Sequence, residues 1–210
     1  MHFSTKDFLY WQELLFNDEY PGYFKPGSER TDSYTVGQYE YAHLAPKYMH
    51  NWCDKGLYCF SRKSSNAFAL LNSLRQVASE RAISMGIGPD FLPRLEDGTL
   101  RFLRYPPGAC IDKHTDFNLF TMPLWRSSWE NYQVDAPHGK GELHVGEILA
   151  MLQPGCDATV HYTTASEVWQ YSVVYFAMPS LASVLPNGMT VADWLVERKK
   201  AARTRDHKDN

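Results

Sequence analysis

The sequence predicts a mostly β protein, an antiparallel sandwich or barrel with helices at its flanks. Two observations support this fold class. Between residues 100 and 177, short apolar runs are separated by turn residues, as is typical of sheets built from several short antiparallel strands. One amphipathic segment precedes these runs and another follows them, which indicates a helix on each side of the β region.

The first helix is expected to begin at Ser65 and to extend for about 20 residues, a usual length in globular proteins. Its hydrophobic side chains recur with the spacing of one helical face. They are Phe68, Leu71, Leu74, Ala78, Ala82 and Met85. Ser64 or Ser65 can cap its start, and Gly86, Gly88 and Pro89 predict where it ends.

The strands are expected as short runs between this helix and a closing helix. They cover residues 100–105, 113–116, 118–125, 132–134, 146–152, 158–162 and 171–177. The closing helix is expected over residues 191–202, with Val191, Trp194 and Leu195 on its apolar side. The polar residues 203–210 are expected to form a disordered tail.

The amino-terminal part, residues 1–60, is less informative. Residues 1–24 contain a short helical pattern, whereas residues 25–60 are rich in Gly, Ser, Tyr and Pro and have little periodicity. No internal repeat or second hydrophobic unit is evident. A single domain over residues 1–210 is therefore predicted, with residues 65–202 supplying the first helix, the β core and the closing helix.

The composition is that of an ordinary globular protein, with 44% hydrophobic and 21% charged residues and a formal net charge of -3. No long basic stretch is present, which argues against a nucleic-acid or membrane-surface partner. The four cysteines form no CxxC pair. No signal peptide is evident, nor a run of roughly 18 apolar residues, so a reducing, cytoplasmic location is expected.

A possible metal site lies in the β region. His114 and Asp116 are two positions apart in an extended segment, where such side chains point to the same side. His161 lies in a separate expected strand, and His144 and His138 are weaker rivals for its role. Two imidazoles and a carboxylate on one side of an ion leave positions open for dioxygen and a substrate, as in non-haem Fe(II) oxygenases. We therefore expect His114, Asp116 and His161 to be catalytic metal ligands.

Several short motifs follow one another in an order that is more specific than any one of them. They are RYPPG, HTD, YQV, VGE, VHYT and YSVVYFAMP. This succession resembles the isopenicillin N synthase-like branch of the Fe(II)/2-oxoglutarate-dependent oxygenases, over about residues 68–202. The resemblance implies a double-stranded β-helix, or jelly roll, that uses Fe(II), 2-oxoglutarate and dioxygen to hydroxylate or desaturate a small-molecule substrate.

The resemblance also implies how 2-oxoglutarate would be held. Tyr105, immediately before the PP pair, and Ser172 match family residues that grip its distal carboxylate. Gln170 stands where the family has an arginine, so a neutral amide replaces a charged, bidentate partner. Arg101 shares the strand parity of Tyr105, and Arg126 lies at the end of the strand after HTD. Either arginine is a candidate to supply the missing cation.

Three functions stay open at this level. The first is a 2-oxoglutarate-dependent oxygenase in which another cation replaces the family arginine. The second is an Fe(II) oxidase that draws all four electrons from its substrate, as isopenicillin N synthase does. The third is an inactive jelly roll that serves as a binding module. The substrate and the oligomeric state are not indicated, and specificity is expected to reside in loops such as residues 126–144 and in the amino-terminal part.

Overall fold

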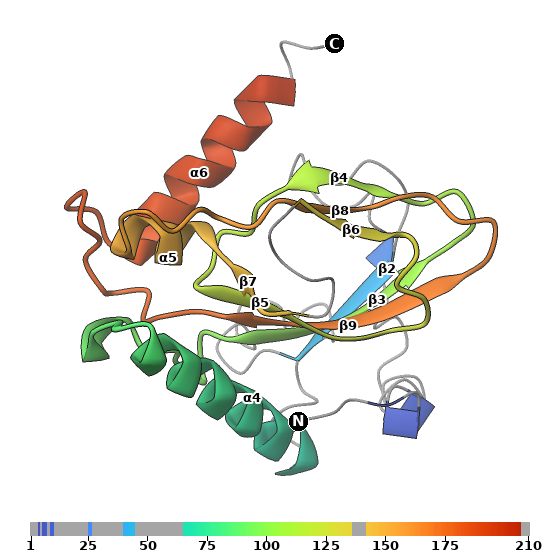
Figure 1. The fold of residues 1–210 in the computed structure, drawn as a ribbon, viewed down its shortest axis with the longest axis horizontal. Coiled ribbons are helices and arrows are strands. Elements are labelled where there is room, and N and C mark those ends of the chain that lie inside the picture. Colours follow the sequence, from blue (N-terminus) through green and yellow to red (C-terminus); the bar gives the residue numbers. More distant parts are fainter. Residues whose placement is uncertain are drawn as a thin grey trace.

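The protein forms two antiparallel sheets with helices outside them (Figure 1). The computed structural model describes residues 4, 6–7, 9–10, 25–26, 40–44, 65–135 and 142–206. The strands of the larger sheet are, in spatial order, β1 (Lys25–Pro26), β2 (Glu40–Leu44), β3 (Thr99–Tyr105), β9 (Gln170–Ala177), β5 (Phe120–Arg126) and β7 (His144–Val145). Those of the smaller sheet are β4 (Ile111–His114), β8 (His161–Thr163) and β6 (Tyr132–Val134).

From β4 to β9 the chain alternates between the two sheets. Strands β4, β6 and β8 belong to the smaller sheet, and β5, β7 and β9 belong to the larger one. Each connection therefore crosses from one sheet to the other, which is the winding of a double-stranded β-helix, or jelly roll. This fold, which the sequence predicted, is confirmed.

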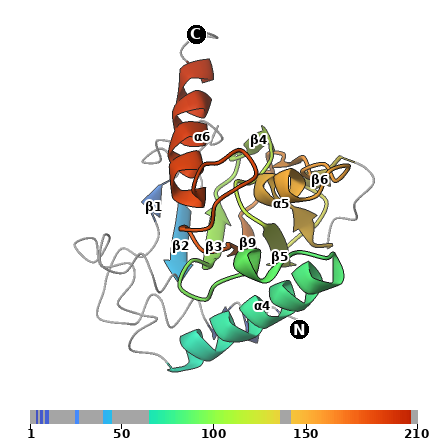
Figure 2. The ribbon, with the colours of Figure 1, turned by 90° about the vertical axis from the view of Figure 1, so that its left-hand side faces the viewer.

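Helix α4 (Ser65–Ser84) packs along the outer face of the larger sheet (Figures 1 and 2). Among its described side chains, Leu71, Leu74, Ala78 and Ala82 are fully buried, as the helical spacing predicted. They share one hydrophobic core with Phe102 of β3 and Tyr175 of β9. Met85, just after the helix, is half-buried, and the side chain of Phe68 lies outside the described residues. Burial of this apolar stripe explains why the helix forms where the pattern placed it.

The alternate side chains of β3 and β9 point to the other side of the larger sheet, toward the smaller one. Leu103, Tyr105 and Val174 form a second core there, and Ile111 of β4 packs against it. Because strand side chains alternate between faces, Arg101 lies on the same face as Leu103 and Tyr105. The interior between the sheets is therefore lined from both sides, by apolar and polar groups.

Three further helices complete the described fold. They are η3 (Pro89–Phe91), α5 (Glu147–Leu152) and α6 (Val191–Asp206). Helix α5 and the start of α6 lie at the same end of the sheets (Figure 1). Val191 and Trp194 of α6 are buried, as predicted. Within the described ranges, no helix has both the length and the apolar character needed to cross a membrane.

Three expectations about secondary structure are wrong. The strand expected over residues 113–116 is β4, which ends at His114, so Asp116 lies in the loop that follows it. Residues 146–152 were expected as a strand, but Glu147–Leu152 is helical. Glu, Leu, Ala and Met are strong helix formers, and a short apolar run does not by itself separate a strand from a buried helical turn. The closing helix also continues to Asp206, so residues 203–206 are not part of a disordered tail.

The amino-terminal expectations are only partly covered by the described residues. Within the helical pattern of residues 1–24, residues 6–7 and 9–10 are helical, and the rest lies outside the described residues. The sequence did not indicate β1 and β2, which extend the larger sheet beyond β3. The candidate cap Ser64 also lies outside the described residues.

Candidate active site

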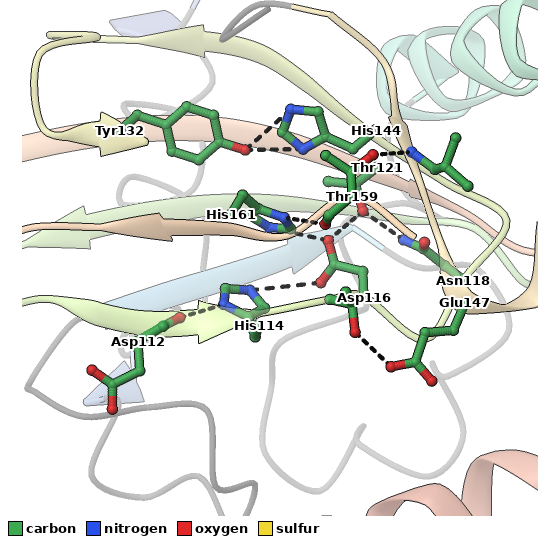
Figure 3. Close-up of polar contacts among 12 residues, drawn as sticks. Asp112, His114, Asp116, Asn118, Thr121, Tyr132, His144, Glu147, Thr159 and His161 are labelled. Carbon is green, nitrogen blue, oxygen red and sulfur yellow. Dashed lines mark hydrogen bonds and ion pairs between the residues drawn. The ribbon is translucent and has the colours of Figure 1, made fainter. Parts of the chain in front are cut away.

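Three predicted ligands come together between the smaller sheet and the loop after β4. His114 ends β4 and is directly opposite His161 of β8, which places their rings 4.4 Å apart. Asp116 follows two residues later, with Oδ2 3.3 Å from His161 Nε2 and Oδ1 3.9 Å from His114 Nε2. One ligand atom from each residue lies within 4.8 Å of the others (Figure 3). Strand register and the short loop therefore build one potential metal-binding cluster.

Both imidazoles are oriented by the same kind of hydrogen bond. His114 Nδ1 lies 2.7 Å from the carbonyl oxygen of Asp112, and His161 Nδ1 lies 3.2 Å from that of Thr159 (Figure 3). A carbonyl oxygen only accepts, so each Nδ1 must carry the hydrogen and donate it. In the neutral ring this leaves the Nε2 lone pair on each histidine directed toward Asp116, which is how outer contacts prepare histidines to bind a metal.

Asp116 is held as an anion. Its Oδ2 accepts a hydrogen bond from Thr121 Oγ1, which in turn accepts one from Asn118 Nδ2 at 2.8 Å. Burial raises the pKa of the Asp116 carboxyl, but the positive charges of His161 and His114 in their protonated forms, the Thr121 hydrogen bond and the charge of Arg101 more than offset it. The pKa therefore lies below its ordinary value. A carboxylate of this kind can ligate a cation without first losing a proton.

The donor set suits Fe(II). Two neutral imidazole nitrogens and one carboxylate oxygen on one side of an ion form the facial triad of non-haem iron oxygenases, which leaves other coordination positions open. The side chains of His114, Asp116 and His161 are 12%, 16% and 8% exposed. The site is thus largely enclosed but still reachable from solvent.

His144 lies beside the cluster and does not belong to it. Its ring is 4.9 Å from that of His161, and its Nδ1 is 3.0 Å from the Tyr132 hydroxyl (Figure 3). Burial, and then the Asp116 carboxylate, raises the pKa of Tyr132 above its ordinary value, so its phenol stays protonated. Sequence reasoning did not single out Tyr132. Its place in the YQV motif, next to the strand that carries His161, was the available signal.

Arg126 is a buried cation close to this cluster, with 5% of its surface exposed. Its Nη2 donates to Thr163 Oγ1 at 3.5 Å and its Nε donates to the Ser128 carbonyl at 3.4 Å, both long contacts. The guanidinium carbon lies 4.5 Å from the centre of the Tyr132 ring. In the described part of the chain, no carboxylate forms an ion pair with Arg126. A desolvated charge of this kind is costly unless an anion binds it.

A buried hydroxyl stands next to this cation. Ser172 of β9 is the register partner of Arg126 of β5, and it is fully buried. Among the described residues its Oγ finds no hydrogen-bond partner. Thr163, which Arg126 contacts, is two residues beyond His161 on the same face of β8, roughly 7 Å along the strand. Among the described residues, a cation without an anionic partner and an unsatisfied hydroxyl therefore lie about one strand repeat from the candidate metal ligands.

The other residues predicted to bind the cosubstrate differ in their contacts and in their distance from Arg126. Gln170 is buried and already engaged, since its Oε1 accepts from Ser127 Oγ at 3.0 Å. Tyr105 is the register partner of Gln170, and its ring centre is 5.5 Å from the Arg126 guanidinium carbon. Arg101 stacks over Phe176 at 4.7 Å, farther along β3. The structure thus brings Tyr105 and Ser172 together around Arg126. Arg101 lies apart from these three residues but close enough to Asp116 for its charge to lower the pKa of that carboxyl.

No protein-family model and no curated protein matches the chain. Solved structures do. A putative oxygenase from Shewanella oneidensis matches 93% of this chain and 85% of its own, at 18% identity and a TM-score of 0.59. A full-length Neurospora crassa protein, in complex with alpha-KG and 5-formyluracil, matches 94% of this chain and 83% of its own, at 18% identity and a TM-score of 0.57. JOX2 in complex with 2OG, Fe and JA matches 76% and 59%, at 14% identity and a TM-score of 0.52.

The chain has the fold of the 2-oxoglutarate and Fe(II) oxygenases. At these identities the likeness concerns the fold, and chemistry has to be argued from the site. The isopenicillin N synthase-like branch, which the motifs resemble, is not singled out by these structures and stays a prediction.

Proposed function

We propose that this protein is an Fe(II)- and 2-oxoglutarate-dependent oxygenase that oxidises a small-molecule substrate, with His114, Asp116 and His161 as the iron ligands. One observation carries the proposal. Two imidazoles, each anchored through Nδ1 to a backbone carbonyl, direct Nε2 toward a buried carboxylate at distances that one ion can bridge. The fold, which is that of the 2-oxoglutarate and Fe(II) oxygenases, also supports the proposal.

The use of 2-oxoglutarate is supported by Arg126. A carboxylate would satisfy both the buried guanidinium and the unpartnered Ser172 hydroxyl. A five-carbon dicarboxylate is long enough to reach from this pair to the metal ligands. Arg126 on β5 would therefore replace the family arginine whose position Gln170 occupies on β9. This favours the cosubstrate-dependent oxygenase over the oxidase and the binding module.

Bound Fe(II) with 2-oxoglutarate would supply oxidation of a substrate C–H bond by dioxygen, with release of succinate and carbon dioxide. The protein's part is to bind, orient and enclose. His114, Asp116 and His161 would hold the ion. Arg126 neutralises the distal carboxylate and so fixes the direction of the cosubstrate. The two sheets surround the site and limit the access of water.

An anaerobic Fe(II) titration, with and without 2-oxoglutarate, tests the proposal. We expect the weak visible metal-to-ligand charge-transfer band of the iron complex in wild type and no band in His161→Ala. Succinate should form in step with oxygen uptake once a substrate is present. Iron binding without any 2-oxoglutarate band would instead indicate the substrate-driven oxidase. Failure to bind iron would indicate the binding module.

A further inference from the structure

One carboxylate near the candidate metal ligands belongs neither to that ligand set nor to the residues proposed to bind the cosubstrate. Glu147, the first residue of α5, lies beside the turn that carries His114 and Asp116 (Figure 3). Its Oε1 accepts from Thr115 Oγ1 at 2.5 Å, and its backbone N–H donates to the Asp116 carbonyl at 2.9 Å. A single residue therefore holds the turn from both its side chain and its backbone.

The same carboxylate forms an ion pair with a residue of the closing helix, α6. Arg198 of α6 donates from Nη2 to Glu147 Oε1 at 2.7 Å and from Nε to Oε2 at 2.8 Å, a bidentate pair. The two side chains are 28% and 15% exposed, so water screens the pair only in part. Both carboxylate oxygens are thus occupied, which explains why Glu147 is not available as a fourth metal ligand.

Further contacts tie α6 to the same turn. The Arg198 guanidinium carbon lies 5.1 Å from the centre of the Phe117 ring. The Phe117 ring also meets Trp194 of α6 edge-on, with centres 6.0 Å apart. Phe117 directly follows the ligand Asp116. The turn between β4 and β5 is therefore held by α5 on one side and by α6 on the other.

Gly146 explains how α5 comes so close to this turn. A Cβ at this position would overlap the backbone oxygen of Asn118, so no other residue fits without a shift of the backbone. The glycine lets its own N–H donate to the Leu119 carbonyl at 2.9 Å, while the Ile148 N–H donates to the Asn118 carbonyl at 3.1 Å. Gly146, Glu147 and Ile148 thus supply three consecutive amides to the turn.

From these contacts we infer that Glu147 and Arg198 are positioning residues for the metal centre. Their pair fixes the turn that carries Asp116, so tight metal binding requires α6 to be docked. This inference rests on the proposed metal site. It assigns a role to two residues, on α5 and α6, that touch neither the ion nor the cosubstrate.

Metal affinity of the full chain tests the inference. Fe(II) under anaerobic conditions and Co(II) in air are the probes, with the visible Co(II) spectrum recorded at saturation. We expect Arg198→Met and Thr115→Val to weaken binding roughly tenfold to 100-fold, the usual effect of losing an outer contact to a metal ligand. The Co(II) bands should shift as well, because the carboxylate ligand is less firmly held. Arg198→Lys keeps the charge but loses the bidentate geometry of the guanidinium, so its metal affinity should lie between those of wild type and Arg198→Met.

The control is another ion pair on the same helix. Lys200 and Glu197 are 2.9 Å apart and well exposed, so Glu197→Gln with Lys200→Met should leave affinity and spectrum unchanged. Thr115→Val keeps the Glu147–Arg198 pair and removes only the Thr115 hydrogen bond to Glu147. It therefore tests the positioning role if Arg198→Met does not fold. Wild-type affinity and an unshifted Co(II) spectrum in the folded variants would overturn the positioning role. Wild type that binds no metal would instead overturn the proposed function itself.

Discussion

In the proposed function, Arg126 is the residue on which cosubstrate binding depends most directly. Burying a guanidinium without an anionic partner costs free energy, and replacing such a charge with a hydrophobic residue of similar volume is often neutral or stabilising. Among the described residues Arg126 has no anionic partner, so stability is reduced at a position where a bound carboxylate would recover it. This is the trade-off expected of a binding residue.

The Arg126→Met variant should separate these two effects. Losing charge-assisted hydrogen bonds worth about 3 kcal/mol should raise the Kd for 2-oxoglutarate by about 100-fold. Fe(II) affinity should be unchanged, and the melting temperature of the unliganded protein should be equal or higher. The charge-transfer titration and thermal unfolding measure these quantities. Arg81→Met, at an exposed position on α4, is the control. An unchanged Kd would show that Arg126 is not the carboxylate partner.

Gly146 should be intolerant of any side chain. The Cβ of Gly146→Ala would meet both the backbone oxygen and the side-chain oxygen of Asn118, and because the backbone cannot move aside as a side chain can, the turn after Asp116 or α5 must shift. Overpacking of this kind costs about 1–3 kcal/mol, and urea unfolding should show a lower midpoint. Gly88→Ala is a matched control, since a Cβ there meets nothing within 4 Å. Equal midpoints for the two variants would contradict the close approach of α5.

At the scale of elements, sequence and structure agree best where a periodic pattern is long. Helix α4 was predicted at its observed position because its apolar stripe spans several turns and ends at Gly86. The short run after Gly146 was misassigned, because six residues fit a strand and a helix equally well until their packing is known.

The same distinction applies to the site: residues in local sequence motifs could be predicted, and those that depend on tertiary pairing could not. The HxD pair and His161 could be named from the sequence, because each ligand stands in a recognisable motif. Arg126 could be named only as one of two candidates, since its place beside Ser172 depends on the pairing of β5 with β9. The role of Glu147 could not be foreseen. Its partner Arg198 lies on α6, and no local pattern connects the two.

Helix α4 acts as a scaffold, so its core should matter for stability. Leu74→Ala removes a fully buried side chain packed under the larger sheet and should cost about 2–5 kcal/mol in the free energy of unfolding. Val77→Ala, at a position that is 37% exposed on the same helix, should cost less than about 0.5 kcal/mol. Chemical denaturation measures both. Similar losses in the two variants would mean that α4 does not pack as described.

For the whole molecule, metal binding and folding should be linked. An ion that binds only the folded chain stabilises it by about 2.7 kcal/mol when its concentration is 100 times its Kd. For a chain of this size that corresponds to roughly 5–10 °C in melting temperature. Calorimetry with Co(II) should show the rise, and a chelator should reverse it. Asp116→Asn should weaken the response, and a full response in His161→Ala would place the ion elsewhere.

The pairing order of the smaller sheet has a consequence for the protein's biosynthesis. His114 and His161 face each other on β4 and β8, and the intervening chain crosses between the sheets several times. A nascent chain that has released only HTD from the ribosome lacks the third ligand and the strand that carries it. A complete site of three candidate ligands can therefore form only after β8 has been made and has paired with β4.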